Sequence, residues 1–334
     1  MVDNMSVSRR HLLGDIGIGF ASLAMSGYVR ALRIQNSARI ALQLYSIREY
    51  IGGGAGTNGN AVSKGVGLER ALEDIAAIGF SGVEFAGYYH FTPQRLKKAL
   101  SAAGIRPCGT HVGNDRYGIN VSRNNLNVDV LKRTCDFELS YGNTLVICPG
   151  GGNIPPGCQW SVGIGGTIGK SSQEIDDFTK KLCELYNKAA EEAKKMGCRI
   201  GIHNHAWEHG VRMRNGMSFW DYFLSNTSKD ICMEQDVGWS TCADVDPRLF
   251  YRKYPGRSPT LHAKENGVGE HVLRFDGILG EPGVPGAKPV DWDGLIPVTE
   301  RDGVQWYVVE CERHAGDLSA VMQSFKFLKS KGLQ

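Results

Sequence analysis

Short apolar segments alternate with segments of helical spacing from residue 38 to the end of the chain. The apolar segments have the length and composition of buried strands: 38–46, 82–87, 105–112, 144–151, 198–205, 230–236, 258–264 and 305–312. Helical spacing follows each of them in turn: 67–78, 93–103, 126–141, 172–196, 218–226, 245–254, 291–301 and 316–331. This strict alternation indicates a parallel sheet, because each helix carries the chain back to start the next strand in the same direction.

The number of strand-helix units indicates that the sheet closes on itself. Eight units are what a closed (β/α)8 barrel requires, and 334 residues are a common length for one such domain. An open, doubly wound sheet would be expected to carry a glycine-rich nucleotide fingerprint after its first strand, but LYSIRE follows here at 44–49. We therefore predict an α/β fold, a (β/α)8 TIM barrel, as a single domain over residues 38–334.

The first 37 residues differ in character from the rest. The string SRRHLL (8–13) precedes a weakly apolar run, 16–29, that is rich in Gly and Ala. It resembles a twin-arginine leader, which carries folded proteins across the bacterial inner membrane. We expect residues 1–37 to be this leader and the protein to be periplasmic or exported. If the segment is a disordered basic tail and not a functional leader, a cytoplasmic location follows. No 18 uninterrupted apolar residues occur, so no stable membrane span is expected.

Composition excludes other classes of protein. A net charge of +3 without a basic stripe argues against a nucleic-acid partner. The 9 cysteines include no C-x-x-C pair, so we expect buried free thiols and no disulfide scaffold. With 42% hydrophobic and 22% charged residues, the chain has the composition of an ordinary globular protein with a sizeable core.

Four predicted strands end in side chains that commonly bind metals. They close with HNH (203–205), Asp236, HAK (262–264) and ECE (310–312). In a closed parallel barrel the carboxyl ends of the strands meet on one face, where active sites lie. We therefore expect one divalent cation among four side chains, with His205 as the rival of His203 for the metal. The four are His203, Asp236, His262 and Glu310.

Alternation along a strand decides which side chains share a direction. The pairs that point the same way are His203 with His205, Glu234 with Asp236, His262 with Lys264, and Glu310 with Glu312. Apolar neighbours such as Ile202 point toward the helices, so the polar set points into the barrel, where a buried charge needs a partner or a metal. Imidazole and carboxylate ligands favour Mn, Co, Zn or Fe over Mg.

The carbonyl and hydroxyl oxygens of a substrate could chelate such an ion, which would then stabilise an enediolate. A carboxylate or imidazole would remove the adjacent proton. The candidate catalytic groups are Glu310, Lys264, His205, Glu84 and His111. Lys264 could stabilise the developing oxyanion or simply neutralise Glu310 or Glu312.

Glu84 and His111 end the second and third strands. They could bind substrate hydroxyls, relay protons or be structural. Three aromatic residues follow strand ends, where a ring could stack on a sugar: Tyr88, Trp207 and Trp239.

Five strings carry a resemblance to a known family: G-I-H-N-H (201–205), D-V-G-W (236–239), V-D-P (245–247), G-R-x-P-x-L-H-A-K-E (256–265) and V-V-E-C-E (308–312). As an ordered set they resemble the xylose isomerase-like TIM-barrel superfamily, and within it the sugar-phosphate isomerase/epimerase branch. The resemblance implies a Glu, Asp, His, Glu metal set on strands five to eight. Asp236, His262 and Glu310 match it, whereas position 203 is His where many members have Glu.

That departure affects the expected reaction. In the ketose epimerases of the superfamily, two metal-bound Glu residues act as opposed acid and base, which His203 puts in doubt. Members with His at this position resemble inosose dehydratases and an exported branch associated with lyases and hydratases of 3-keto sugars and glycosides. The resemblance thus implies a metal-dependent isomerase, epimerase or lyase that removes a proton alpha to a carbonyl of a small carbohydrate. A homo-oligomer and a partner oxidoreductase are both compatible with it.

Two other hypotheses compete with a metal-dependent carbohydrate enzyme. The barrel could be a non-catalytic sugar-binding or partner subunit, with His203 marking a decayed site. A metal-dependent abasic-site endonuclease shares the fold, but it needs more ligands and a basic groove.

Overall fold

The computed structural model describes residues 38–334 except 53–64, 151–157, 160–165, 168–171, 267–276, 283–287, 312 and 314–315. The leader predicted at 1–37 lies outside the described residues, as does Glu312. Within the described part of the chain, none of the helices combines the length and apolar character that crossing a membrane requires.

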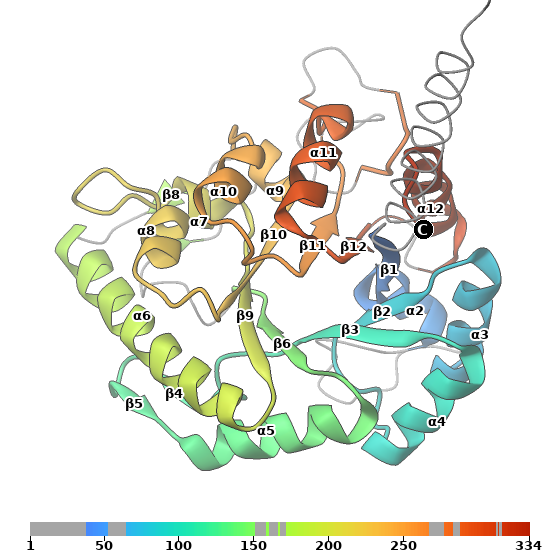
Figure 1. Cartoon of the computed structure of the whole chain (residues 1–334), viewed down its shortest axis with the longest axis horizontal. Helices are drawn as coiled ribbons and strands as arrows, with labels where there is room; N and C mark the ends of the chain where they lie inside the picture. Colours follow the sequence, from blue (N-terminus) through green and yellow to red (C-terminus); the bar gives the residue numbers. More distant parts are fainter. Residues whose placement is uncertain are drawn as a thin grey trace, which may run out of the picture. The chain divides into compact units, whose positions relative to one another are not determined.

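Eight parallel strands form a closed barrel, as the alternation of the sequence predicts (Figure 1). In chain order they are β1 (Arg39–Gln43), β2 (Gly82–Phe85), β3 (Arg106–His111), β6 (Leu145–Cys148), β9 (Arg199–His203), β10 (Cys232–Asp236), β11 (Thr260–Ala263) and β12 (Trp306–Val309). Each strand pairs with the barrel strands that come before and after it along the chain. The first strand, β1, pairs with both β2 and the last strand, β12, so the ring is closed. The carboxyl ends of all eight strands therefore open on the same side.

The eight predicted helices are all present, on the outside of the ring (Figure 1). They are α3 (Leu68–Ile78), α4 (Pro93–Ala103), α5 (Val128–Tyr141), α6 (Ser172–Lys195), α8 (Phe219–Ser225), α10 (Arg248–Lys253), α11 (Trp292–Asp302) and α12 (Ser319–Ser330). Gly104 and Gly142 end α4 and α5 in the left-handed conformation, at φ values of 68° and 99°. These positions favour glycine because it has no Cβ to clash.

The strands are shorter than the sequence predicts. The extension of the fifth strand to residue 205 is wrong, because the strand ends at His203 and a helix begins at Ala206. Short helices follow three strands almost at once: η1 (Leu44–Ile47) with α2 (Arg48–Ile51), α7 (Ala206–Gly210) and α9 (Val237–Cys242). Two small hairpins, β4 (Ile119–Asn120) with β5 (Asn125–Leu126) and β7 (Cys158–Gln159) with β8 (Gly166–Thr167), also lie outside the barrel.

The barrel strands separate two environments. Side chains such as Ile202, Leu261 and Val309 point outward into the main core, which lies between strands and helices. Inside the barrel, the amino-terminal half is filled by small apolar clusters: Ala41, Cys108, Trp306 and Val308, and Leu145, Ile147 and Cys232. The carboxyl-terminal half of the interior holds the ionisable side chains described next.

Candidate metal centre

Side chains at the carboxyl ends of four neighbouring strands converge inside the barrel. His203 ends β9 and Asp236 ends β10, His262 lies in β11, and Glu310 directly follows β12. All four are buried, and one ligand atom from each lies within 4.8 Å of the others. We refer to these four residues as the outer cluster. The structure therefore brings together the side chains that the sequence nominates as metal ligands.

Asp236 connects the strand to the short helix that follows it. Its Oδ1 accepts a hydrogen bond of 2.8 Å from the backbone N–H of Trp239 and so caps α9. Its Oδ2 is buried without a hydrogen-bond partner among the described residues. This oxygen lies 4.0 Å from His203 Nε2 and 3.9 Å from His262 Nδ1.

These distances fit a shared ion. Two ligand atoms on a tetrahedral ion with bonds of about 2.1 Å lie about 3.4 Å apart. Small movements of Asp236 and the two imidazoles would complete the shell, and a cation would satisfy the unpartnered Oδ2. A donor set of two imidazoles and two carboxylates suits Mn, Co, Zn or Fe.

Charge around Glu310 keeps that carboxyl group ionised. Glu310 Oε2 lies 2.6 Å from His262 Nδ1, and its Oε1 lies 3.6 Å from Lys264 Nζ. Burial would raise the pKa of Glu310, but the charges of Lys264 and His262 outweigh it and lower the pKa far below its ordinary value. Lys264 is itself buried, with its Nζ 5.0 Å from the centre of the Trp239 ring. The neutralising role considered for Lys264 thus has a direct structural basis.

Burial acts differently on Asp236. It raises the pKa of that carboxyl group to about 7, while the charges of Lys264 and Glu310 pull in opposite directions. A carboxylate that is costly to ionise in a buried position gains most from a cation beside it.

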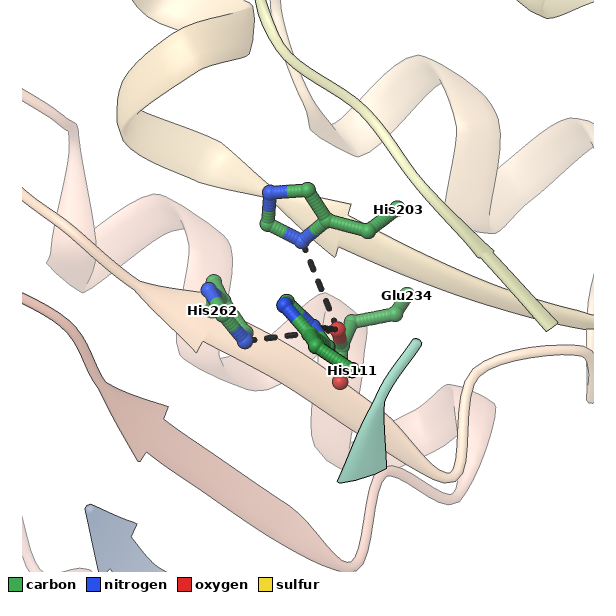
Figure 2. Close-up of side chains that lie close together, drawn as sticks. All are labelled: His111, His203, Glu234 and His262. Atoms are coloured by element: carbon green, nitrogen blue, oxygen red, sulfur yellow. Dashed lines mark hydrogen bonds and ion pairs between the residues drawn. The ribbon is translucent and has the colours of Figure 1, made fainter. Parts of the chain in front are cut away.

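A second group of ionisable residues lies beside the outer cluster, and we call Glu84, His111 and Glu234 the inner cluster. Figure 2 shows the rings of His111, His203 and His262 gathered around the carboxylate of Glu234. His111 Nε2 lies 2.8 Å from both Glu84 Oε1 and Glu234 Oε2. Glu84 and Glu234 are fully buried, so two carboxylates share the imidazoles that surround them.

The inner cluster also shifts pKa values. Burial disfavours a charge on His111, but the charge of Glu84 and hydrogen bonds to Glu234 and Glu84 prevail and raise its pKa to about 9. Burial would raise the pKa of Glu84, but His111 and His262 lower it far below its ordinary value. In contrast, burial and then the charge of His262 hold the pKa of His203 well below 6.5. His203 is thus kept neutral, which is the form that binds a metal. Burial disfavours a charge on His262 as well, but the charges of Glu234, Glu84 and Glu310 prevail and raise its pKa well above 6.5, so a metal would displace a proton from His262.

The other candidate residues take different positions. His205 is the N-cap residue of α7; its side chain is 25% exposed, and its ring centre lies 4.9 Å from that of His203. It lies beside the outer cluster but in neither group of ligand atoms. Trp207, expected near the substrate, instead packs against Phe219 in the main core. The hydroxyl of Tyr88 donates to Glu138 on α5.

Three further residues complete the site, none of them assigned a role from the sequence. Glu234 shares its direction with Asp236, which is the signal that could have identified it. Gln43, at the end of β1, donates a 2.6 Å hydrogen bond to Glu84. Glu208 accepts a 2.7 Å hydrogen bond from the backbone N–H of His205, and burial raises its pKa.

Comparisons with known proteins agree with this architecture. A model of the family described as xylose isomerase-like TIM barrel matches residues 72–331. An inosose dehydratase from Serratia proteamaculans is 24% identical over 263 residues, which are 74% of this chain and 83% of that protein.

Solved structures show the same fold. A sugar phosphate isomerase/epimerase from Parabacteroides distasonis has a TM-score of 0.63 at 20% identity, over 88% of this chain and 94% of that one. An L-ribulose 3-epimerase has a TM-score of 0.58 at 17% identity, over the same shares of the two chains. With the family model matching most of its length, the chain belongs to the xylose isomerase-like TIM barrel family.

Proposed function

We propose that the protein is a metal-dependent carbohydrate enzyme that removes a proton from the carbon next to a carbonyl group. The observation that carries this proposal is the outer cluster, in which the unpartnered Oδ2 of Asp236 faces a nitrogen of each of two imidazoles. A cation bound there would stabilise this buried carboxylate oxygen. A divalent ion held there supplies Lewis-acid polarisation of a substrate carbonyl.

The residues around the cluster can carry out the proton transfer. Glu310 is a carboxylate at the end of β12, beside His262 and Lys264, and can accept a proton from carbon, provided that the substrate lies within about 3 Å of it. Lys264 lies beside Glu310 and places a positive charge where negative charge develops on the substrate oxygen. His205 is the partly exposed imidazole at the edge of the site, suited to donating a proton to a departing hydroxyl.

We favour elimination of water or of another β-substituent over epimerisation. The curated relatives with significant similarity are inosose dehydratases. In addition, His203 replaces one of the two carboxylates that a symmetric epimerisation would use. The proposed substrate is a keto sugar, a 3-keto glycoside or a cyclic keto polyol. We further propose that residues 1–37 direct the enzyme to the periplasm.

A panel of substrates in D₂O tests the function. The metal-loaded protein is incubated with inosose, 3-keto glucosides and free ketoses, and the products are followed by NMR and mass spectrometry. We expect loss of water or of the glycosidic substituent from at least one cyclic ketone, with Asp236→Asn inactive. Glu138→Gln is the matched control, because Glu138 is a buried carboxyl group on the helix side of the barrel. Reprotonation with deuterium and no elimination would show an isomerase or epimerase, and no reaction on any member of the panel would contradict the proposal.

A further inference from the structure

Both imidazoles of the outer cluster present their second nitrogen to one carboxylate. His203 Nδ1 and His262 Nε2 each lie 3.3 Å from Glu234 Oε2. The opposite nitrogens, His203 Nε2 and His262 Nδ1, are the ones that face Asp236 Oδ2. Glu234 therefore contacts the nitrogen of each ring that is opposite to the one facing Asp236. Figure 2 shows both rings next to the Glu234 carboxylate.

The chemistry of imidazole makes this position consequential. A neutral ring has one N–H and one lone pair, so a nitrogen that binds a metal leaves the other nitrogen protonated. The protonated nitrogen then needs an acceptor, which fixes the tautomer and the orientation of the ring. For His203 the carboxylate in reach is Glu234, and for His262 it is Glu234 together with Glu84, at 2.8 Å.

We propose that Glu234 is a positioning residue that selects which nitrogen each imidazole offers to the metal. In this arrangement His203 binds through Nε2 and its Nδ1–H, which has no other hydrogen-bond partner among the described residues, is left to Glu234 at 3.3 Å. His262 binds through Nδ1, and its Nε2–H lies 2.8 Å from Glu84 and 3.3 Å from Glu234. The inference rests on the proposed function in that it takes the outer cluster as the metal site. It explains how an imidazole can serve at position 203, since a neutral imidazole ligand, unlike a carboxylate, needs an acceptor behind it.

Glu234 is held firmly enough to act in this way. Its Oε1 accepts a 2.7 Å hydrogen bond from Thr260 Oγ1, and its Oε2 lies 2.8 Å from His111 Nε2. His111 is fixed in turn by Glu84. A Cβ at Gly109 would lie 2.7 Å from Glu84 Oε2, so the absence of a side chain there leaves room for that carboxylate.

An alternative metal site shares His203 and His262 with the outer cluster but uses their opposite nitrogens. His111, His203, Glu234 and His262 also place one ligand atom each within 4.8 Å of one another. An ion bound there would take the nitrogens that face Glu234, His203 Nδ1 and His262 Nε2. Each neutral ring has a single lone pair, so the two arrangements exclude each other and have opposite tautomers.

The tautomers can be read directly by ¹⁵N NMR of the Zn²⁺-loaded full-length protein labelled at histidine. Signals are assigned with the variants His203→Asn and His262→Asn. We expect zinc-bound Nε2 with protonated Nδ1 at His203, and zinc-bound Nδ1 with protonated Nε2 at His262. The reverse at both residues would overturn the inference and leave a metal-dependent function standing, whereas a protein that binds no divalent metal would contradict the proposed function as well.

Metal affinity gives a second, independent readout. Competition of Zn²⁺ with a chelating dye should show that Glu234→Gln weakens binding about 10–100-fold while one ion per chain is retained. Glu138→Gln, which also removes a buried carboxylate, should bind Zn²⁺ like the wild type. An unchanged affinity in Glu234→Gln would contradict the inference.

A coupled variant tests the link between the two residues. His203→Glu should bind Zn²⁺ poorly on its own, because the new carboxylate would face Glu234 in the position where Nδ1 lies at 3.3 Å. Adding Glu234→Gln should recover binding, since it removes the repulsion and the need for an acceptor. Effects of the two substitutions that simply add would argue against the coupling.

Discussion

The two halves of the barrel interior are built on the same strands but differ in chemical character, since one is apolar and the other is rich in ionisable groups. Along β12, Trp306 and Val308 belong to an apolar cluster, and Glu310, two residues further on, belongs to the outer cluster. Along β10, Cys232 packs on Leu145 and Ile147, whereas Glu234 and Asp236 are buried carboxyl groups. The amino-terminal half resembles any protein core, and the carboxyl-terminal half concentrates groups that are costly to bury.

This difference shows how the fold separates stability from chemistry. Apolar side chains stabilise the barrel by leaving water and need no specific partner. Buried ionisable groups destabilise it unless each finds a counter-charge or a metal, and removing one partner leaves the other exposed to that penalty. Substitutions in the amino-terminal half should therefore mainly lower stability, and substitutions in the carboxyl-terminal half should mainly lower activity.

Asp236→Asn should give the largest effect of all on activity. Loss of this proposed ligand, with the Lewis acid that it would help to hold, should reduce turnover by at least about 10³-fold, equivalent to about 4 kcal/mol of transition-state stabilisation. Elemental analysis should show little bound metal after dialysis. Because burial raises the pKa of Asp236, the apo variant should also resist thermal unfolding as well as or better than apo wild type at neutral pH. Full activity with no metal would contradict this assignment.

Glu310→Gln should remove the proposed proton acceptor. General acid-base groups contribute about 10²–10⁴-fold to rate, so kcat should fall by that factor. The amide also removes the charge that faces Lys264 and His262. Metal content, measured beside the kinetics, separates loss of the base from loss of a ligand. A kcat within twofold of wild type would exclude Glu310 as the base.

Leu145→Ala tests the other half of the barrel. Leu145 is buried in the apolar cluster with Ile147 and Cys232, so truncation should lower the free energy of unfolding by about 2–5 kcal/mol. Metal affinity and kcat, measured well below the melting temperature, should stay near wild-type values. A large loss of metal affinity in this variant would show that the two halves are not independent.

His209 offers an effect that vanishes at neutral pH and a contrast with the histidines inside the barrel. Burial, with a contribution from Arg212, lowers its pKa to about 3, so the folded protein cannot take up the proton that the unfolded chain binds below its pKa of about 6.5. The contribution of His209 to the free energy of unfolding is therefore fully present above pH 6.5. It is lost as the pH falls, by about 1.4 kcal/mol per pH unit. We expect the free energy of unfolding, measured with denaturant between pH 4 and 7, to depend less steeply on pH in His209→Gln than in the wild type. Equal slopes in the two proteins would contradict the assignment.

The sequence predicts the barrel and the convergence of the outer cluster because both follow from simple periodicities. Eight alternating units predict closure, and the two-residue period of a strand places His203, Asp236 and His262 on the inner face. Glu234 has the same period, but an argument based on the last residue of each strand gives it no role.

The exact ends of the strands could not be predicted in the same way. They depend on capping side chains such as Glu208, which holds the backbone of His205 and turns the chain into α7. Such contacts arise only once the helix has formed, and hydrophobic periodicity carries no trace of them. The turn also explains why Trp207 packs into the main core and away from the substrate face.

Titration of the metal-free enzyme tests the central claim most directly. Apo protein is prepared by exhaustive chelation, and Mn²⁺, Co²⁺ or Zn²⁺ is added in steps while loss of the α-hydrogen of a keto-sugar substrate into solvent is followed by NMR. We predict negligible exchange in the apo protein, a linear rise with added metal and a plateau at one ion per chain. Full exchange in the metal-free protein, or exchange that does not respond to bound metal, would contradict the account.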